Sequence, residues 1–414
     1  MRREYVKRVT MSVSPRRART IAGCIAMFML AGCSWFESDT ETRVPVKLLS
    51  IDREVALVKR WTVNIGGELK DKAVKLVPVV DGGRIYAAAA DGEVAAVDTA
   101  TGKIIWQQSI LAFYDSKERA IAFTGNQDAV TSGVGIGADL VLVGSAAGEI
   151  IALNQADGSL AWRAKTTSEV LSAPVISRKH VFAQTIDGKV AAYSTQTGDR
   201  EWIYSTSNPS LTVRGTSNLI AQKDFLIAGF ANGRVAMLDQ ERGLVGFEQR
   251  VAVARGQSDL ERLVDIDGQM LLLGPLLYAV SYQGSLVAID LTANGRIRWS
   301  KDASSLAGLG EGFGNIYIAY EDSRLEAVAA DDNHHDLWMN GDLLYRDITT
   351  PVTVSSYVAV GDFEGYLHLL AQTDGRFVGR EKIDGAGLSA PVVADGSRLY
   401  VITNSGRLMA FEVR

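Results

Sequence analysis

Few side chains in this chain have the chemistry of a redox, nucleophilic or metal site. The 414 residues include two cysteines and four histidines. Cys24 and Cys33 both lie near the N-terminus, so the rest of the chain offers neither a disulfide nor a thiolate metal ligand. The sequence also lacks the G-x-S-x-G, phosphate-loop and HExxH motifs. These observations argue against the common kinds of catalytic site.

The run from Asp331 to Asp336, DDNHHD, is the one cluster with the residue types of metal ligands. It lacks the ligand spacing of a defined coordination geometry, and it coincides with a turn that recurs along the chain. The other histidines, His180 and His368, fall within strand-like runs. We interpret the cluster as a solvated turn and expect neither a metal nor a cofactor.

Cys33 carries the most specific chemical signal. Basic residues at 16–19 precede a short apolar run at 21–30, which is the pattern of a bacterial secretory signal. The sequence Leu30-Ala31-Gly32-Cys33 resembles the lipobox of bacterial lipoproteins. That resemblance implies a signal peptide over residues 1–32 and a mature chain that begins at Cys33, with acyl chains such as palmitate on its thiol and amine. Ser34 resembles the pattern sorted to the outer membrane.

Two alternatives concern the same region. An uncleaved anchor helix is disfavoured, because 10–14 apolar residues are too few to span a bilayer comfortably. Ile21-Ala22-Gly23-Cys24 mimics a lipobox, but almost no apolar core precedes it. Met11 is a second candidate for the start of translation. Residues 33–56 are polar and outside any repeat, so we expect a lipidated flexible tether there.

A repeated unit, first seen at residues 91–106, supplies the elements that would position any site. It reads DGEVAAVDTATGKIIW, with turns at Asp91-Gly92 and Thr101-Gly102 and a final Trp106. Copies follow at a mean spacing of about 45 residues, a period typical of a β-propeller with several short strands per blade. The first turns of the eight copies lie at Gly92, Gly148, Gly188, Gly233, Gly284, Ser323, Gly365 and Gly406.

The repeat predicts an all-β fold, an eight-bladed β-propeller of four-stranded antiparallel blades over residues 57–414. The eighth copy ends at Arg414 without an outer strand, whereas residues 58–63, VKRWTV, form an outer strand without a copy. We therefore expect the N-terminal strand to close the ring, which removes two exposed sheet edges. Bulky indoles should pack between neighbouring blades. The structural tryptophans predicted in this way are Trp61, Trp106, Trp162, Trp202, Trp299 and Trp338.

Charge argues against nucleic-acid binding. Residues 1–32 hold seven basic residues and one acid, so the remainder has 36 basic and 47 acidic residues, a formal net charge of −11. A basic face is the expected footprint of nucleic acid, and an acidic body lacks it.

The Trp and Gly repeat resembles that of pyrroloquinoline quinone (PQQ) dehydrogenases, which makes an enzyme the first alternative. Those enzymes stack the cofactor between a Trp and a vicinal disulfide. This body has no Cys, and the repeat and Trp35 account for all seven tryptophans. We therefore expect no enzyme, while a periplasmic glycan-binding propeller remains a second alternative.

The lipobox, the eight repeats and the closing strand together resemble the BamB family, the propeller lipoproteins of the β-barrel assembly machinery (BAM complex), over the whole chain. The resemblance implies a non-catalytic scaffold, lipid-anchored on the periplasmic face of the outer membrane. It also implies binding to a periplasmic POTRA domain of BamA and to other subunits of the machinery. Such a scaffold would assist the folding and insertion of outer-membrane proteins, and unfolded outer-membrane proteins are further candidate partners.

The resemblance also implies a set of partner-binding residues, in two irregular segments. Residues 211–215, LTVRG, resemble the family's interface segment, with Val213 in place of the usual Leu. Residues 265–267, DID, resemble a second family segment. Leu211, Val213, Arg214, Asp265 and Asp267 are therefore expected at the interface, the charged ones through charge-assisted hydrogen bonds. The alternative is that Arg214 and both aspartates are solvated loop charges.

Overall fold

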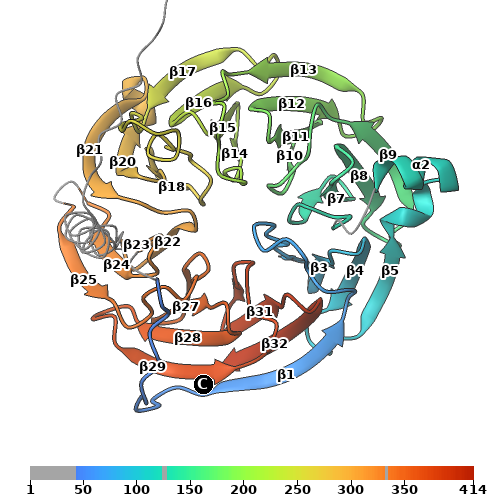
Figure 1. The fold of residues 1–414 in the computed structure, drawn as a ribbon. Coiled ribbons are helices and arrows are strands. Elements are labelled where there is room, and N and C mark those ends of the chain that lie inside the picture. Colours follow the sequence, from blue (N-terminus) through green and yellow to red (C-terminus); the bar gives the residue numbers. More distant parts are fainter. Residues whose placement is uncertain (1–42, 124–127, 332–333) are drawn as a thin grey trace, which may run out of the picture. The chain divides into compact units, whose positions relative to one another are not determined.

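A ring of eight antiparallel sheets makes up the computed structural model of this protein (Figure 1). The structure describes residues 43–123, 128–331 and 334–414, and within them the chain forms 32 strands, four in each sheet. All the strands belong to residues 45–414, a unit separate from residues 1–44. The predicted eight-bladed propeller is confirmed. The expected signal peptide, Cys33 and the first part of the expected tether, residues 33–42, lie outside the described residues.

Each blade takes its strands in chain order from the ring axis outward. Blades one to four comprise β2 (Val79–Asp81), β3 (Arg84–Ala88), β4 (Glu93–Asp98), β5 (Ile104–Ser109); β6 (Gly135–Gly137), β7 (Leu140–Ser145), β8 (Glu149–Asn154), β9 (Leu160–Lys165); β10 (Val175–Ser177), β11 (His180–Thr185), β12 (Lys189–Ser194), β13 (Arg200–Ser205); and β14 (Ile220–Gln222), β15 (Phe225–Gly229), β16 (Arg234–Asp239), β17 (Val245–Arg250).

Blades five to eight follow the same pattern, except that the outer strand of blade eight is β1. They comprise β18 (Leu271–Leu273), β19 (Leu276–Val280), β20 (Gly284–Asp290), β21 (Arg296–Ala303); β22 (Gly308–Gly312), β23 (Asn315–Ala319), β24 (Leu325–Ala329), β25 (Asp336–Asn340); β26 (Val352–Val354), β27 (Tyr357–Gly361), β28 (Tyr366–Ala371), β29 (Phe377–Lys382); and β30 (Val393–Asp395), β31 (Arg398–Ile402), β32 (Arg407–Val413), β1 (Leu57–Asn64).

The N-terminal strand closes the ring, as predicted. β1 pairs antiparallel with β32 from Leu57 opposite Val413 to Asn64 opposite Arg407. The register shifts between Lys59 and Trp61, as it does near the equivalent tryptophan of other outer strands. Pairing the first strand with the last leaves neither end of the repeat as an open sheet edge.

The structure places the repeated tryptophans between neighbouring blades. In five of the six, the ring lies over a turn glycine of the next blade and its Nε1–H donates to a carbonyl of that turn, at 2.9–3.0 Å. A Cβ on these glycines would lie 2.3–2.6 Å from the ring, so only glycine fits there. The five pairs are Trp61–Gly102, Trp106–Gly158, Trp162–Gly198, Trp202–Gly243 and Trp338–Gly375. The sixth, Trp299, stacks on His334 with ring centroids 4.7 Å apart.

Residues 110–123, which follow β5, contact blade two. They contain a short 3₁₀ turn, η1 (Ile110–Phe113), and the helix α2 (Ser116–Ala122), which Asp115 and Glu118 cap reciprocally. The Tyr114 hydroxyl donates to Glu149 at 2.6 Å, and the Arg163 guanidinium lies 3.8 Å from the Tyr114 ring centre. A second 3₁₀ turn, η2 (Leu291–Ala293), follows β20. In the described part of the chain, no helix has the length and apolar character to cross a membrane.

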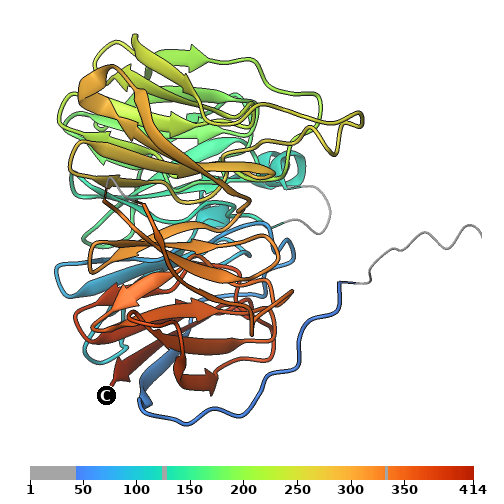
Figure 2. The ribbon, with the colours of Figure 1, turned by 90° about the vertical axis from the view of Figure 1, so that its left-hand side faces the viewer.

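Residues 45–56 differ from the expected tether, because they lie along the outside of blade seven (Figure 2). The amides of Glu54 and Val55 donate to the carbonyl of Val378, at 2.9 and 3.0 Å. Val55 is 4% exposed and joins the apolar cluster of blades seven and eight. The open edge of β29 offers backbone acceptors that this segment satisfies. A free tether therefore remains an expectation only for residues 33–44.

Candidate partner-binding site

The two segments that the sequence singled out meet beside blade four, which they flank in the chain. Residues 211–216 belong to the connection from β13 to β14, and residues 265–267 precede β18. The Val213 amide donates to Oδ1 of Asp265 at 3.0 Å. A Cβ on Gly215 would lie 2.8 Å from the Asp267 carboxyl carbon, so glycine lets the two segments approach closely. The structure thus joins residues about 50 positions apart into one site.

Asp265 and Asp267 lie beneath this site rather than on its surface. They are 0% and 8% exposed, and among the described residues no donor reaches Oδ2 of either. Burial raises the pKa of Asp265 to about 6. Burial and the neighbouring Asp265 raise the pKa of Asp267 to about 8, against the opposing effect of Lys75.

This burial means that the two aspartates are not solvated loop charges. Asp265 holds the backbone of residues 211–216 through the Val213 amide. A direct contact of either carboxylate with a partner stays a prediction.

Arg214 is a brace between blades rather than a free surface cation. Its Nε donates to Asp71 at 2.6 Å, and its two terminal nitrogens donate to the Glu169 carboxylate at 2.8 Å each. Asp71 precedes blade one and Glu169 precedes blade three, so one guanidinium links three parts of the ring. The side chain remains 40% exposed. Bidentate pairing of this kind holds an arginine in one orientation.

Leu211 is the predicted residue with the most accessible apolar surface. It is 40% exposed, whereas Val213 is half-buried. A cavity of about 410 Å³ lies beside Arg214, with Asp71, Asp128 and Glu169 in its wall. The site therefore combines an exposed apolar residue with a recess lined by charged groups of both signs.

Three residues of this site were missed from the sequence. Asp71 and Glu169 hold Arg214, and Asp128 accepts the amides of Lys70 and Asp71 at 3.1 and 2.8 Å. Asp71 and Asp128 stand in no motif. Glu169 could have been noticed, because the matching opening of copy eight, also followed by LSAP, has an alanine there.

A second cavity, of about 350 Å³, opens near the ring axis, with Lys75, Thr216 and Asp267 among its lining residues. Lys75 reaches from blade one across the axis and donates to the Leu306 carbonyl at 3.0 Å. Burial lowers the pKa of Lys75, and the nearby Asp267 opposes this effect. The described residues contain no group of three or more His, Cys, Asp or Glu placed to hold a metal ion.

Comparison with known proteins identifies the family. A family model described as outer membrane protein assembly factor BamB matches residues 58–125 and 115–340. Outer membrane protein assembly factor BamB of Pseudomonas aeruginosa is 40% identical over 385 residues, covering 93% of this chain and 96% of that protein. The chain belongs to the BamB family. The Escherichia coli K12 BamB is 31% identical over 387 residues, covering 92% of this chain and 96% of that protein.

Solved structures agree with this assignment. The crystal structure of BamB from Moraxella catarrhalis has a TM-score of 0.74 at 28% identity and covers 86% of this chain and 100% of that one. Quinohemoprotein alcohol dehydrogenase from Comamonas testosteroni has a TM-score of 0.67 at 15% identity, covering 87% of this chain and 76% of that one. That second likeness shows the fold alone. As a BamB-family member the chain is an outer membrane protein assembly factor and not an enzyme.

Proposed function

We propose that this chain is a lipid-anchored scaffold on the periplasmic face of the outer membrane. It binds a periplasmic POTRA domain of BamA through the surface formed by Leu211, Val213 and Arg214. It thereby positions the barrel-inserting protein, together with the other subunits of the machinery, for the folding and insertion of outer-membrane proteins. In this proposal Asp265 and Asp267 support the surface from below.

One observation carries the proposal: the exposed Leu211 belongs to a segment that three carboxylates hold in place by hydrogen bonds. The Val213 amide is bound to Asp265, and Arg214 is bound to Asp71 and Glu169. A segment fixed in this way loses little conformational entropy on docking, so less of the contact energy is offset by the cost of ordering it. Arginine is enriched among binding hot spots, and the energetically neutral contacts around a hot spot exclude water from it.

The binding test uses the purified POTRA region of BamA and calorimetric titration. Leu211→Ala should weaken binding by about 1–2 kcal/mol, roughly five- to thirtyfold in Kd, because it removes apolar area that docking would bury. Leu244→Ala is the matched control, since Leu244 is 59% exposed in the turn between β16 and β17, outside the two segments that form the site. The proposal is wrong if Leu211→Ala and Leu244→Ala bind alike while both stay folded.

A second pair of variants separates support from direct charge contact at Asp265. Asp265→Asn keeps an oxygen that can accept the Val213 amide, whereas Asp265→Ala does not. If Asp265 supports the segment, the Asp265→Asn variant should bind the POTRA region with nearly wild-type affinity. The Asp265→Ala variant should bind it more weakly. If both variants instead lose the same amount of affinity, and added salt makes their difference from wild type smaller, a direct charge contact with the partner is favoured.

A further inference from the structure

Residues 45–56, here called the strap, are held on blade seven by backbone contacts. The Val46 amide donates to the Leu344 carbonyl at 3.1 Å, and the amides of Glu54 and Val55 donate to the Val378 carbonyl. At its end the strap joins the sheet, because Ala56 and Arg414 exchange two backbone hydrogen bonds. The strap therefore has a defined path before β1 begins.

The middle of the strap does not pack tightly on the ring. A cavity of about 260 Å³ lies against residues 49–52, with Asp342, Phe377 and Arg380 on the blade side. Leu49 is 67% exposed, whereas Leu48 packs on the apolar cluster of blades six and seven. Contacts at separate points, rather than continuous burial, thus hold this segment in place.

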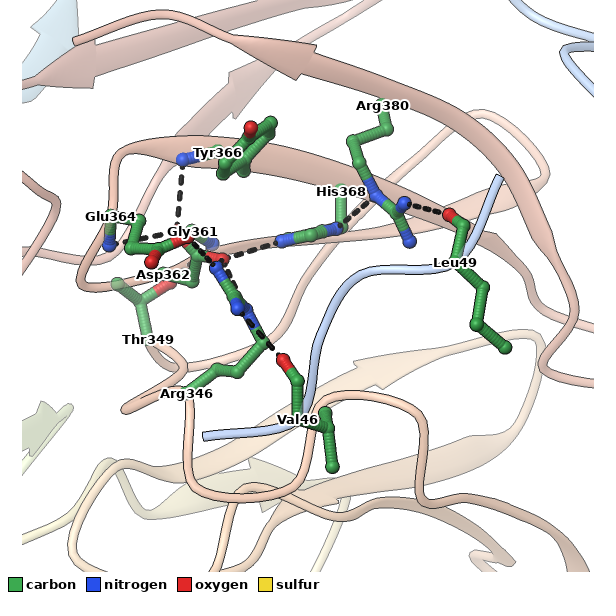
Figure 3. A network of polar contacts seen from close by, with 10 residues as sticks. All are labelled: Val46, Leu49, Arg346, Thr349, Gly361, Asp362, Glu364, Tyr366, His368 and Arg380. Carbon is green, nitrogen blue, oxygen red and sulfur yellow. Dashed lines mark hydrogen bonds and ion pairs between the residues drawn. The ribbon is translucent and has the colours of Figure 1, made fainter. Parts of the chain in front are cut away.

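Two arginines of blade seven hold the strap by its carbonyl oxygens (Figure 3). Arg346 donates from Nη1 to the Val46 carbonyl at 3.0 Å and from Nε to the Asp362 carboxylate at 2.8 Å. Arg380 donates from Nη1 to the Leu49 carbonyl at 2.6 Å and from Nε to Nδ1 of His368 at 3.0 Å. Each guanidinium therefore has one side on the strap and the other on a buried polar group.

The buried groups bind each other and make one network of the two arginines. Asp362 and His368 are both 0% exposed, and Nε2 of His368 lies 3.0 Å from Oδ2 of Asp362. Because Arg380 donates to Nδ1, that nitrogen carries the lone pair and Nε2–H donates to Asp362. The histidine in this geometry is neutral. A proton on Nδ1 would face the Nε–H of Arg380 and break the bond that orients it.

Such a network is a costly way to stabilise a blade. Buried ion pairs are often no more stable than apolar residues of the same volume, because desolvation offsets their attraction. Apolar residues, however, cannot donate hydrogen bonds to the backbone carbonyls of the strap. The arrangement therefore fits a role in holding the strap.

We propose that the network of Arg346, Asp362, His368 and Arg380 is a clamp for the strap, so that the chain leaves the ring at a fixed place on blade seven. The clamp does not depend on the proposed lipid anchor or partner.

Hydrogen exchange of the full chain, read by mass spectrometry on peptides that cover residues 45–56, tests the clamp. At neutral pH the amides of Val46, Glu54 and Val55 should exchange at least about tenfold more slowly than unstructured peptide. Leu48→Ser should speed this exchange about tenfold, and the matched control Leu49→Ser should leave it unchanged. Arg380→Gln should speed it too, because it loses the hold on the Leu49 carbonyl.

The pH profile distinguishes a clamp from ordinary packing. The charged groups that face His368 are Asp362, Arg380 and Arg346, and burial is the main cause of its lowered pKa. Acidification well below pH 6.5 should therefore release the strap in wild type before the rest of blade seven opens. His368→Gln can accept from Arg380 and donate to Asp362 without titrating, so it should keep the strap protected at both neutral and acid pH.

Two results would overturn the clamp: an unprotected strap in wild type, or protection in Arg380→Gln equal to wild type with the same melting temperature. Loss of acid sensitivity in His368→Gln, with protection at neutral pH retained, supports it. These readings concern the strap alone. They can succeed while the POTRA titration fails, so the clamp and the proposed function are tested separately.

Discussion

Closure of the ring can be tested at Trp61, the tryptophan of the N-terminal strand. Its Nε1–H donates to the Thr99 carbonyl of blade one at 3.0 Å, and its ring covers Gly102 of the same blade. It also lies 5.9 Å from the ring of Tyr400 in blade eight. Trp61 therefore joins the last blade to the first, and Trp61→Ala should weaken that boundary.

The size of the effect follows from the contacts that are lost. Replacing a buried Trp by Ala lowers the free energy of unfolding by about 3–5 kcal/mol. Because Trp61 is only half-buried, we expect a loss of about 3 kcal/mol. The unfolding entropy is about 2.1 cal/mol/K per residue, so a ring of roughly 370 residues has a total unfolding entropy of about 0.8 kcal/mol/K. The melting temperature should then fall by about 4 °C.

Thermal unfolding followed by circular dichroism, at one scan rate, measures this fall. Trp338→Ala is the matched control, because Trp338 is also half-buried, donates to Gln372 at 2.9 Å and covers Gly375. It lies at an internal boundary of the ring. The two variants should lose similar amounts. If Trp61→Ala melts within about 1 °C of wild type while Trp338→Ala falls by several degrees, the N-terminal strand does not close the ring as described.

Two further predictions concern the anchor and the buried acid. Cys33→Ala should release the protein from the outer membrane, as measured by membrane fractionation, and an unmodified mature peptide that spans residues 32–34 in wild type would contradict processing at Cys33. The raised pKa of Asp267, about 8, means that the folded state holds a proton which the unfolded state loses near pH 4; wild-type stability should therefore fall as pH rises from about 4 to 8 at this group. Asp267→Asn removes that loss, so its melting temperature relative to wild type should increase between pH 5 and 9, and a difference independent of pH would refute the burial.

The fold could be predicted because each blade repeats its own local signals. A first-turn glycine marks seven of the eight copies, and a tryptophan ends five of them. The outer strand expected at residues 58–63 is β1, Leu57–Asn64. The eighth copy lacks an outer strand after Arg407–Val413. Pairing it with the N-terminal strand is the arrangement that leaves neither of these two strands unpaired.

The contacts of the site and of the strap could not be predicted from the sequence, because they join distant parts of the chain. Arg214 is held by Asp71 and Glu169, which become its neighbours only when the ring closes. The strap is polar and non-repetitive, and nothing local in residues 45–56 indicates that Arg346 and Arg380 bind its carbonyls. The burial of Asp265 likewise depends on packing between blades, which spacing in the sequence does not reveal.

The central claim is that the surface around Leu211 meets BamA in the cell. Site-specific photo-crosslinking tests it most directly, with a photoreactive residue at Leu211 and, as the control, at Leu244 in the turn between β16 and β17. The account predicts a covalent adduct with BamA from position 211 and none from position 244. Adducts from position 244 alone, or no adduct with BamA from position 211 in a folded, membrane-bound protein, would contradict it.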